Sequence, residues 1–327
     1  MKTRLILATA AVFAALVGAE TASAQAKLWG TPGPCDRTCL IATAKTYLAA
    51  LAAHDPGKAP LASNLKFVEN AEPKNAGEGL WQTASSVPSD FAIFVPDPVS
   101  EQIGFIGMLT EGDKPLQLGL RLKVEGGKIV EAEHLVVRSF FNAGALENLR
   151  TPRPGLLATV PPKERLTREL MLAIGMTYYD SLEQSDGSAS PFADDCERHE
   201  NGLITAGPGG GPAGPGGQPR QGCAVQLDSR AMSYIDSIDL RRVWIADPET
   251  GLAFGLSQFR HSMTMPNKEI TVIGPNGERS QRKVDFNPFD LPAMHIFKIR
   301  GGKIHEIEAL GTMRPYMSKN GWSDFLK

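Results

Sequence analysis

Apolar side chains recur with helical spacing in two stretches of the chain, and short apolar segments follow each of them. The first predicted helix begins after Asp36, a suitable N-cap, and ends near Ala53. The second runs from about Lys163 to Glu183. Strands are expected at residues 66–69, 91–95, 103–109, 116–124 and 129–137, and again at 243–246, 252–259, 293–299 and 304–310. Because helices precede an antiparallel meander in each half, the predicted fold class is α+β.

The two halves of the sequence are copies of one domain. Residues 46–70 match residues 177–201 at a constant offset of 131, and residues 121–135 match residues 296–310 at an offset of 175. The second copy therefore carries extra residues between its matching ends. A glycine- and proline-rich loop at 206–222 and a predicted hairpin at 270–286 account for most of them. These limits predict a first domain at 25–150, a linker at 151–162 and a second domain at 163–327.

The first 24 residues have the pattern of a signal peptide. Lys2 and Arg4 precede an apolar run, and Ala22-Ser23-Ala24 is a small-residue cleavage site. The apolar run is short for a membrane span, and no later stretch reaches that length. We therefore expect an exported protein, periplasmic or secreted, without a membrane partner.

Four cysteines in an exported chain favour disulfides over a metal site. Cys196 and Cys223 flank the glycine- and proline-rich loop and are predicted to pair. Cys35 and Cys39 could also pair, and the sequence leaves this open. Neither pair has the close spacing of a zinc site, so no metal is expected.

Charge and motifs exclude several functional classes. The 327 residues include 34 Lys and Arg against 36 Asp and Glu, and no basic stripe is present, so a nucleic-acid partner is not expected. The sequence contains no nucleophile elbow, phosphate-binding loop, HExxH motif or dinucleotide fingerprint. No cofactor is therefore predicted.

Several short motifs carry a family resemblance. The first helix ends in Tyr47-Leu-Ala-Ala-Leu-Ala-Ala-His-Asp-Pro, Pro60-Leu-Ala follows, and the last hairpin of each copy contains Gly-Gly-Lys-Ile-x-Glu-x-Glu. With these motifs the chain resembles the SnoaL-like and ketosteroid-isomerase-like superfamily, whose fold is named after nuclear transport factor two. The Glu-Asn pair after Pro-Leu-Ala also resembles a little-characterised group of exported bacterial and fungal proteins.

The resemblance implies two tandem cones, in each of which helices pack on a strongly curved antiparallel sheet around a one-ended apolar pocket. Some relatives isomerise, dehydrate, cyclise or hydrolyse small molecules by acid/base chemistry, and others only bind ligands or partners. The acid and base groups of the family vary in position, so the inward-facing polar residues of this chain must be identified directly.

Strand alternation indicates which polar side chains point into the cones. The repeat aligns His295 with Leu120, so this histidine takes a place that is apolar in the first copy. We expect the chemistry in the second cone, with His295, His261 and His199 as acid or base and Tyr178 as hydrogen-bond donor. Ligand contacts are expected from His134, Arg138, Tyr47, Arg198, Glu200 and Asn201.

Each candidate also has a structural interpretation. A histidine on an apolar face can be a hydrogen-bonded core residue. The two tyrosines, Glu200 and Asn201 recur in both copies, which fits a scaffold role. The Glu-x-Glu pairs at 131/133 and 306/308 are expected on the outer, solvated faces of the sheets.

The leading functional hypothesis is an exported, cofactor-independent enzyme that moves a proton on a small, largely apolar molecule. An isomerase, a lyase or dehydratase and an epoxide-type hydrolase all fit. The alternative is an exported protein that binds a ligand or partner without chemistry. The sequence does not indicate the oligomeric state.

Overall fold

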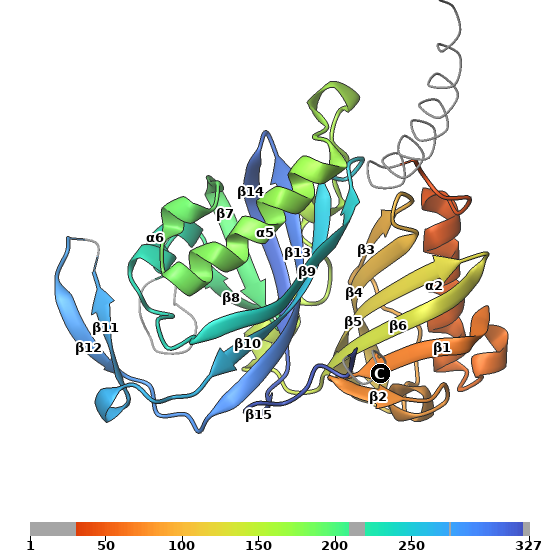
Figure 1. Cartoon of the computed structure of the whole chain (residues 1–327), viewed down its shortest axis with the longest axis horizontal. Helices are drawn as coiled ribbons and strands as arrows, with labels where there is room; N and C mark the ends of the chain where they lie inside the picture. Colours follow the sequence, from red (N-terminus) through yellow and green to blue (C-terminus); the bar gives the residue numbers. More distant parts are fainter. Residues whose placement is uncertain (1–30, 209–219, 275, 323–327) are drawn as a thin grey trace, which may run out of the picture.

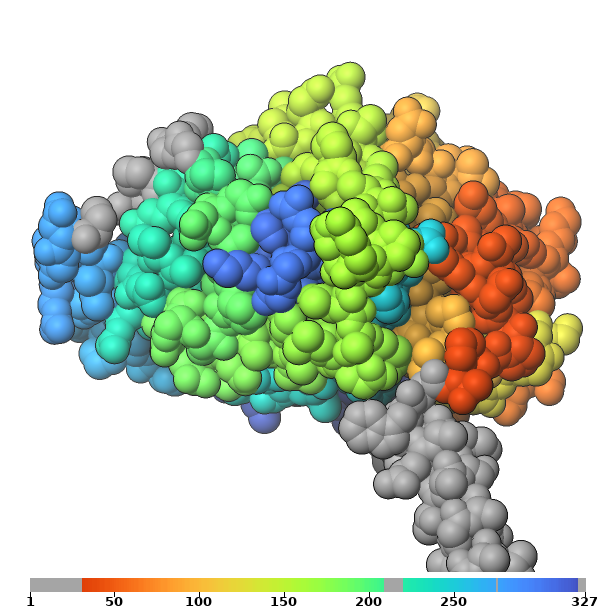
Figure 2. Space-filling model, turned by 90° about the horizontal axis from the view of Figure 1, so that it is seen from above, coloured from red at the N-terminus to blue at the C-terminus, as the bar shows by residue number. Residues whose placement is uncertain are grey.

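The computed structural model describes residues 31–208, 220–274 and 276–322. The predicted signal peptide and most of the glycine- and proline-rich loop lie outside these ranges. Two large curved sheets stand face to face in the described part, and a long helix covers the far side of each (Figure 1). The segment around the linker lies over the junction between the two halves (Figure 2).

The first half consists of one long helix, two 3-10 helices and six strands. They are α2 (Arg37–Ala52), η1 (Pro56–Lys58), β1 (Leu61–Glu69), β2 (Glu72–Lys74), η2 (Gly79–Gln82), β3 (Ala92–Asp97), β4 (Gln102–Glu111), β5 (Lys114–Glu125) and β6 (Lys128–Val137). Three short helices connect the halves: α3 (Ala143–Asn148), α4 (Pro154–Leu157) and η3 (Pro162–Glu164).

The second half repeats this order with additions. Its helices are α5 (Arg168–Gln184), η4 (Gly187–Ala189), α6 (Cys223–Asp228) and η5 (Pro266–Lys268). Its strands are β7 (Phe192–Glu200), β8 (Leu203–Ala206), β9 (Ser237–Asp247), β10 (Leu252–His261), β11 (Glu269–Ile273), β12 (Arg279–Lys283), β13 (Phe289–Arg300), β14 (Lys303–Gly311) and β15 (Arg314–Pro315).

The two sheets have the same strand order. The first is β2-β1-β6-β5-β4-β3, and the second is β8-β7-β14-β13-β10-β9 with β15 added beside β13. In each sheet the first long strand pairs in parallel with the last strand of the antiparallel meander, β1 with β6 and β7 with β14. This shared topology confirms the repeat and the α+β class. The predicted hairpin is present as the separate pair β11 and β12.

Capping residues fix where the two long helices begin. Asp36 accepts a hydrogen bond from the backbone N–H of Cys39 at 2.8 Å, as expected for the first helix. The second helix begins at Arg168, later than predicted, because Thr167 is its N-cap. Residues 162–164 before it form a 3-10 turn.

Each sheet packs on its long helix around an apolar core of its own. A third apolar core lies between the sheets, because their outer faces pack against each other. It contains Phe91, Ile93, Val95, Ile106, Met108, Leu135, Val137, Leu149, Leu156, Ile245, Leu252, Phe254, Leu256, Met294, Ile296 and Leu310. The expectation that the Glu-x-Glu pairs are solvated is therefore wrong. Glu133 is buried between Arg121 and Arg242, and Glu308 is 1% exposed beside Arg153.

The contacts between the halves are reciprocal. Arg168 Nε donates to Asp97 Oδ2 at 2.7 Å, and Arg37 Nη2 donates to Asp247 Oδ2 at 3.1 Å. The two arginines are the first residues of the long helices, Arg37 of α2 and Arg168 of α5. The two aspartates end equivalent strands, β3 and β9. Such exchange of equivalent contacts is the pattern of a two-fold symmetric dimer, formed here within one chain.

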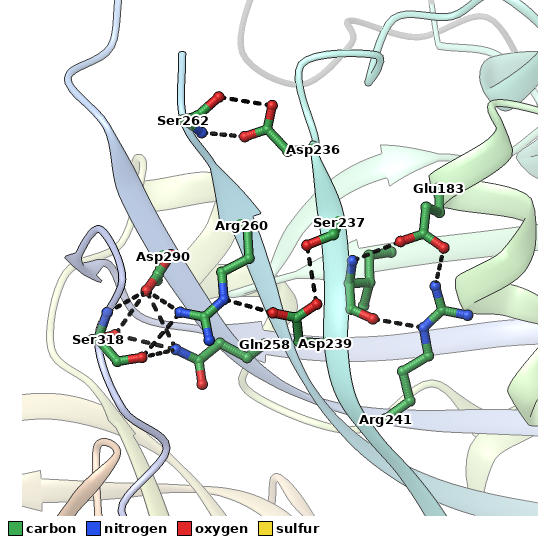
Figure 3. Close-up of polar contacts among 11 residues, drawn as sticks. Glu183, Asp236, Ser237, Asp239, Arg241, Gln258, Arg260, Ser262, Asp290 and Ser318 are labelled. Atoms are coloured by element: carbon green, nitrogen blue, oxygen red, sulfur yellow. Dashed lines mark hydrogen bonds and ion pairs between the residues drawn. The ribbon is translucent and has the colours of Figure 1, made fainter. Parts of the chain in front are cut away.

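The C-terminal segment is tied to the second sheet by polar contacts (Figure 3). The backbone N–H of Ser318 donates to Asp290 Oδ2 at 2.7 Å, and Gln258 Nε2 donates to the Ser318 carbonyl at 2.9 Å. On the other side of the sheet, Arg241 of β9 pairs with Glu183 of α5. The contacts of Ser318 hold the C-terminal segment against β10 and β13. The Arg241–Glu183 pair holds β9 against α5.

Both cysteine pairs form disulfides. The Cys196–Cys223 bond joins β7 to α6, as predicted, and the Cys35–Cys39 bond encloses the start of α2. In the ranges that the structure describes, no helix is long and apolar enough to cross a membrane.

Removing an arginine from a buried ion pair between the halves should destabilise the protein more than removing one from an exposed pair. Arg168→Ala should lower the free energy of unfolding by about 3 kcal/mol, because Asp97 is 1% exposed and would lose its charged partner. Arg150→Ala is the control, since the Arg150–Glu147 pair is exposed and should contribute no more than about 0.5 kcal/mol. Urea unfolding measures both, and equal losses would contradict the role given to Asp97.

Candidate functional site

A cavity of about 110 Å³ lies inside the second sheet, on the side covered by α5. Its wall consists of Tyr178, Leu182, Glu200, Asn201, Met232, Tyr234, Ile235, Phe259, His261, Leu291, Ala293, His295, Ala309, Leu310 and Gly311. The wall is mostly apolar with a few polar groups, which is the usual composition of a small-molecule site. Five of the predicted site residues meet here: Tyr178, Glu200, Asn201, His261 and His295.

A second cavity, of about 30 Å³, lies between the two sheets. It has room for little more than a water molecule. We therefore take the larger cavity as the candidate site.

His295 lies on β13, opposite Ala309 of β14, and faces the cavity wall. Its ring stacks parallel to that of Phe297, and its Nδ1 is 3.2 Å from the hydroxyl of Tyr179. Burial lowers the pKa of His295 to about 3, and the charge of Arg198 adds to this effect. The imidazole is therefore neutral at physiological pH.

His261 ends β10 at another side of the cavity. Its ring lies flat on Phe289, with the centroids 4.0 Å apart. Burial lowers the pKa of His261 to about 4, against a hydrogen bond with the Phe289 backbone that raises it. Its Nδ1 is buried without a hydrogen-bond partner among the described residues. Ser262 Oγ donates to Asp236 at 2.8 Å and so ties this strand end to the turn before β9 (Figure 3).

Tyr178 receives its electrostatic environment from a buried arginine. Arg198 is 1% exposed, and its guanidinium binds Thr205 Oγ1 at 2.9 Å, Glu200 Oε1 at 3.1 Å and Gln226 Oε1 at 2.5 Å. Burial raises the pKa of Tyr178 to about 12, while the charge of Arg198 and a hydrogen bond with it act in the opposite direction. Tyr178 is thus a protonated phenol beside a fixed positive charge, which favours donation to a ligand oxygen.

Asn201 lines the cavity, but its amide is used by the backbone. Its Oδ1 accepts from the Gly311 N–H at 2.9 Å, and its Nδ2 donates to the Gly311 carbonyl at 3.0 Å. Asn70 makes the corresponding contact with the Val136 N–H in the first half. Both asparagines have a positive φ, 48° and 49°, that few other residues adopt readily. This shared geometry explains why the asparagine occurs in both copies.

His199 does not belong to the cavity, contrary to its grouping with His295 in the sequence. Strand alternation places Arg198 and Glu200 inside and His199 on the outer face. There His199 Nε2 lies 2.7 Å from Glu197 Oε1, and burial lowers the pKa of this histidine. Arg153 from the linker binds the same cluster of side chains.

Two of the predicted residues of the first half, Tyr47 and His134, belong to a buried hydrogen-bonded cluster. Tyr47 Oη and His134 Nε2 are 2.9 Å apart, and His134 Nδ1 is 3.2 Å from Glu69 Oε2. His134 therefore ties β6 to the helix. Arg138 does not join it, because Arg138 pairs at the surface with Glu111 at 2.6 Å.

Aromatic rings fill the space around this cluster. Trp81 packs edge-on against Tyr47 with ring centroids 5.1 Å apart, and Phe67 packs on His134 at 4.7 Å. Phe67 holds the position that Arg198 takes in the second half. The loop that carries Trp81 is replaced there by the longer segment with α6, which the Cys196–Cys223 bond anchors to β7.

Sequence reasoning missed Tyr179, the only side chain among the described residues that is hydrogen-bonded to His295. A signal was present, since the repeat aligns Tyr179 with the apolar Leu48. Tyr234 of the turn before β9 was also missed, because no corresponding residue marks it in the first half.

Comparison with known proteins gives the following similarities. The family model of a domain of unknown function, DUF8021, matches residues 164–311. No curated protein matches the chain.

Solved structures resemble about half of the chain at low identity. A putative polyketide cyclase from Silicibacter sp. TM1040 is 16% identical, with 49% of this chain and 96% of that chain covered and a TM-score of 0.29. A putative polyketide cyclase from Xanthomonas campestris pv. campestris is 16% identical over 44% and 90%, with a TM-score of 0.27. A putative SnoaL-like polyketide cyclase from Jannaschia sp. CCS1 is 9% identical over 45% and 89%, with a TM-score of 0.27.

The low pKa of His295 predicts a change in acid stability. As pH falls below the ordinary histidine value of 6.5, the unfolded chain takes up a proton that the folded chain does not bind until about pH 3, so stability is lost. His295→Leu removes this difference and should reduce the loss between pH 7 and pH 5 by about 2 kcal/mol. Urea unfolding at the two pH values measures it. The same pH dependence in both proteins would show that the folded chain binds a proton at His295 as readily as the unfolded chain does, and would contradict the lowered pKa.

Proposed function

We propose that the second domain binds a small, largely apolar molecule in its cavity and transfers a proton to or from it without a cofactor. The observation that carries this proposal is the convergence of two neutral imidazoles and one phenol, His295, His261 and Tyr178, on a single apolar cavity. Neutral imidazole is the form that accepts a proton. A predicted signal peptide and two disulfides support an exported protein.

The electrostatics favour a substrate with an oxygen beside the reacting carbon. Tyr178, held next to Arg198, can donate to that oxygen and stabilise the negative charge that develops during proton removal. Isomerisation, dehydration and epoxide opening all need such charge stabilisation. The reaction class is therefore acid/base chemistry, as isomerase, lyase or epoxide-type hydrolase.

A non-catalytic binding protein is the second candidate. The low pKa values of His295 and His261 favour it, because a weakly basic imidazole is a poor proton acceptor at neutral pH. In that case the same groups would only orient a ligand.

Proton exchange at carbon separates the two candidates. Cyclohexanone and 2-indanone should exchange their α-protons in D₂O faster with the protein than with buffer, as followed by NMR. His295→Ala should lower this rate by roughly 100-fold. His305→Ala is the control, because His305 lies outside the cavity beside Asp195 and should leave the rate unchanged.

Two other results of this experiment would contradict the enzyme. Ketone binding without exchange, weakened by His295→Ala, would support the binding protein. An unchanged exchange rate with a lower melting temperature would make His295 a core residue and reject the assignment.

A further inference from the structure

The internal repeat provides a reference for each residue around His295. Its neighbours in the second half are Tyr179 on α5 and Gly255 on β10, which pairs directly with His295 across the sheet. In the first half the equivalent positions are Leu48, Phe105 and Leu120, and Phe105 pairs with Leu120 in the same register. All three residues of the first half are buried and apolar, at 0–1% exposure.

The three replacements compensate one another in volume and polarity. A Cβ atom on Gly255 would lie 2.6 Å from the Tyr179 hydroxyl, so the space for that hydroxyl exists only because the residue is glycine. The phenylalanine of the first half would fill it. The hydroxyl that enters this space reaches Nδ1 of His295 at 3.2 Å. A buried histidine, its hydrogen-bond partner and the room for that partner are thus present together.

We infer that Tyr179 is a positioning residue, whose hydroxyl donates to Nδ1 of His295 and keeps the proton of the neutral ring on Nε2. The inference rests on the proposed function and deepens it. His295 would then present an N–H donor to the ligand, so it would bind a carbonyl or ether oxygen together with Tyr178. The proton acceptor would be His261.

The protonation of Tyr179 indicates which group donates in its hydrogen bond with His295. Burial raises the pKa of Tyr179, so its hydroxyl keeps its proton and needs an acceptor. His295 Nδ1 is the acceptor in hydrogen-bonding position. The nearby Ser257 hydroxyl acts to lower the pKa of Tyr179, which is the effect of a donor to the phenol oxygen and not of an acceptor. With a proton on Nδ1, the Tyr179 oxygen would be the acceptor, and its hydroxyl proton would have to turn away from His295 to another acceptor.

The tautomer also divides the roles of the two histidines. Nδ1 of His261 is buried and has no hydrogen-bond partner among the described residues. In the proposed arrangement the proton of this ring is on Nε2, and the lone pair of Nδ1 faces the ligand. One cavity histidine would donate and the other would accept, which is what proton transfer beside an oxygen atom requires.

Nitrogen-15 NMR of the full protein tests the inference without any ligand. In the parent protein, His295 should show a pyrrole-type Nε2 and a pyridine-type Nδ1. Tyr179→Phe keeps the ring and removes the hydroxyl, so both shifts should move toward a mixture of tautomers. Gly255→Ala should cause the same change by displacing the hydroxyl. Tyr47→Phe removes the tyrosine–histidine contact inside the first half, between Tyr47 and His134, and it should leave the His295 signals in place.

The rate measurement adds a functional readout. With cyclohexanone in D₂O, Tyr179→Phe should lower kcat about tenfold and change KM less, because the ring still binds but no longer holds one tautomer. A pyrrole-type Nδ1 in the parent protein, or His295 shifts unaffected by Tyr179→Phe, would overturn the inference. Absence of exchange in the parent protein would instead reject the proposed function, since the NMR result does not depend on turnover.

Discussion

The packing of the two sheets through their outer faces is the constraint on which the rest of the structure depends. It buries the apolar side chains of both outer faces and the carboxylates of Asp97 and Glu133. Buried carboxylates are stable only with charged or hydrogen-bonding partners, which the opposite half supplies through Arg168 and Arg242. Because both outer faces are packed, the space between the sheets is small, and the larger of the two described cavities lies on the inner face of the second sheet, under its long helix.

Within this symmetric frame the two interiors differ, and the difference is costly. A buried arginine, Arg198, stands where the first half has Phe67, and it must be compensated by Thr205, Gln226 and Glu200. Two buried histidines add further desolvation. The first half also buries a histidine, but both ring nitrogens of His134 have partners, Tyr47 and Glu69. The second half leaves Nδ1 of His261 without one among the described residues, which fits selection for binding or chemistry rather than for stability.

Local periodicity and the repeat predicted much of the site. Strand alternation and the match of His295 with Leu120 predicted that His295 faces inward and singled out the second half, whereas His261 was proposed because it has no counterpart in the first copy. The sequence could not predict that Glu133 and Glu308 are buried, because that depends on contacts between distant segments. His199 was also included in the predicted site, because alternation along the strand separates His199 from Arg198 and Glu200 but does not show which of the two faces is the inner one. Tyr179 was missed beside Tyr178 because both neighbours on the helix are buried.

The same desolvation that makes the imidazoles weak bases makes the hydrogen-bond donors of the cavity effective. A donor held in a low-dielectric site stabilises a developing negative charge more than it would in water, and it needs no reorganisation during the reaction. A weak base can then suffice, provided that the substrate proton is acidified by donation to the adjacent oxygen. We therefore restrict the proposed proton transfer to protons beside a carbonyl or similar oxygen, because burial makes both His261 and His295 weak bases.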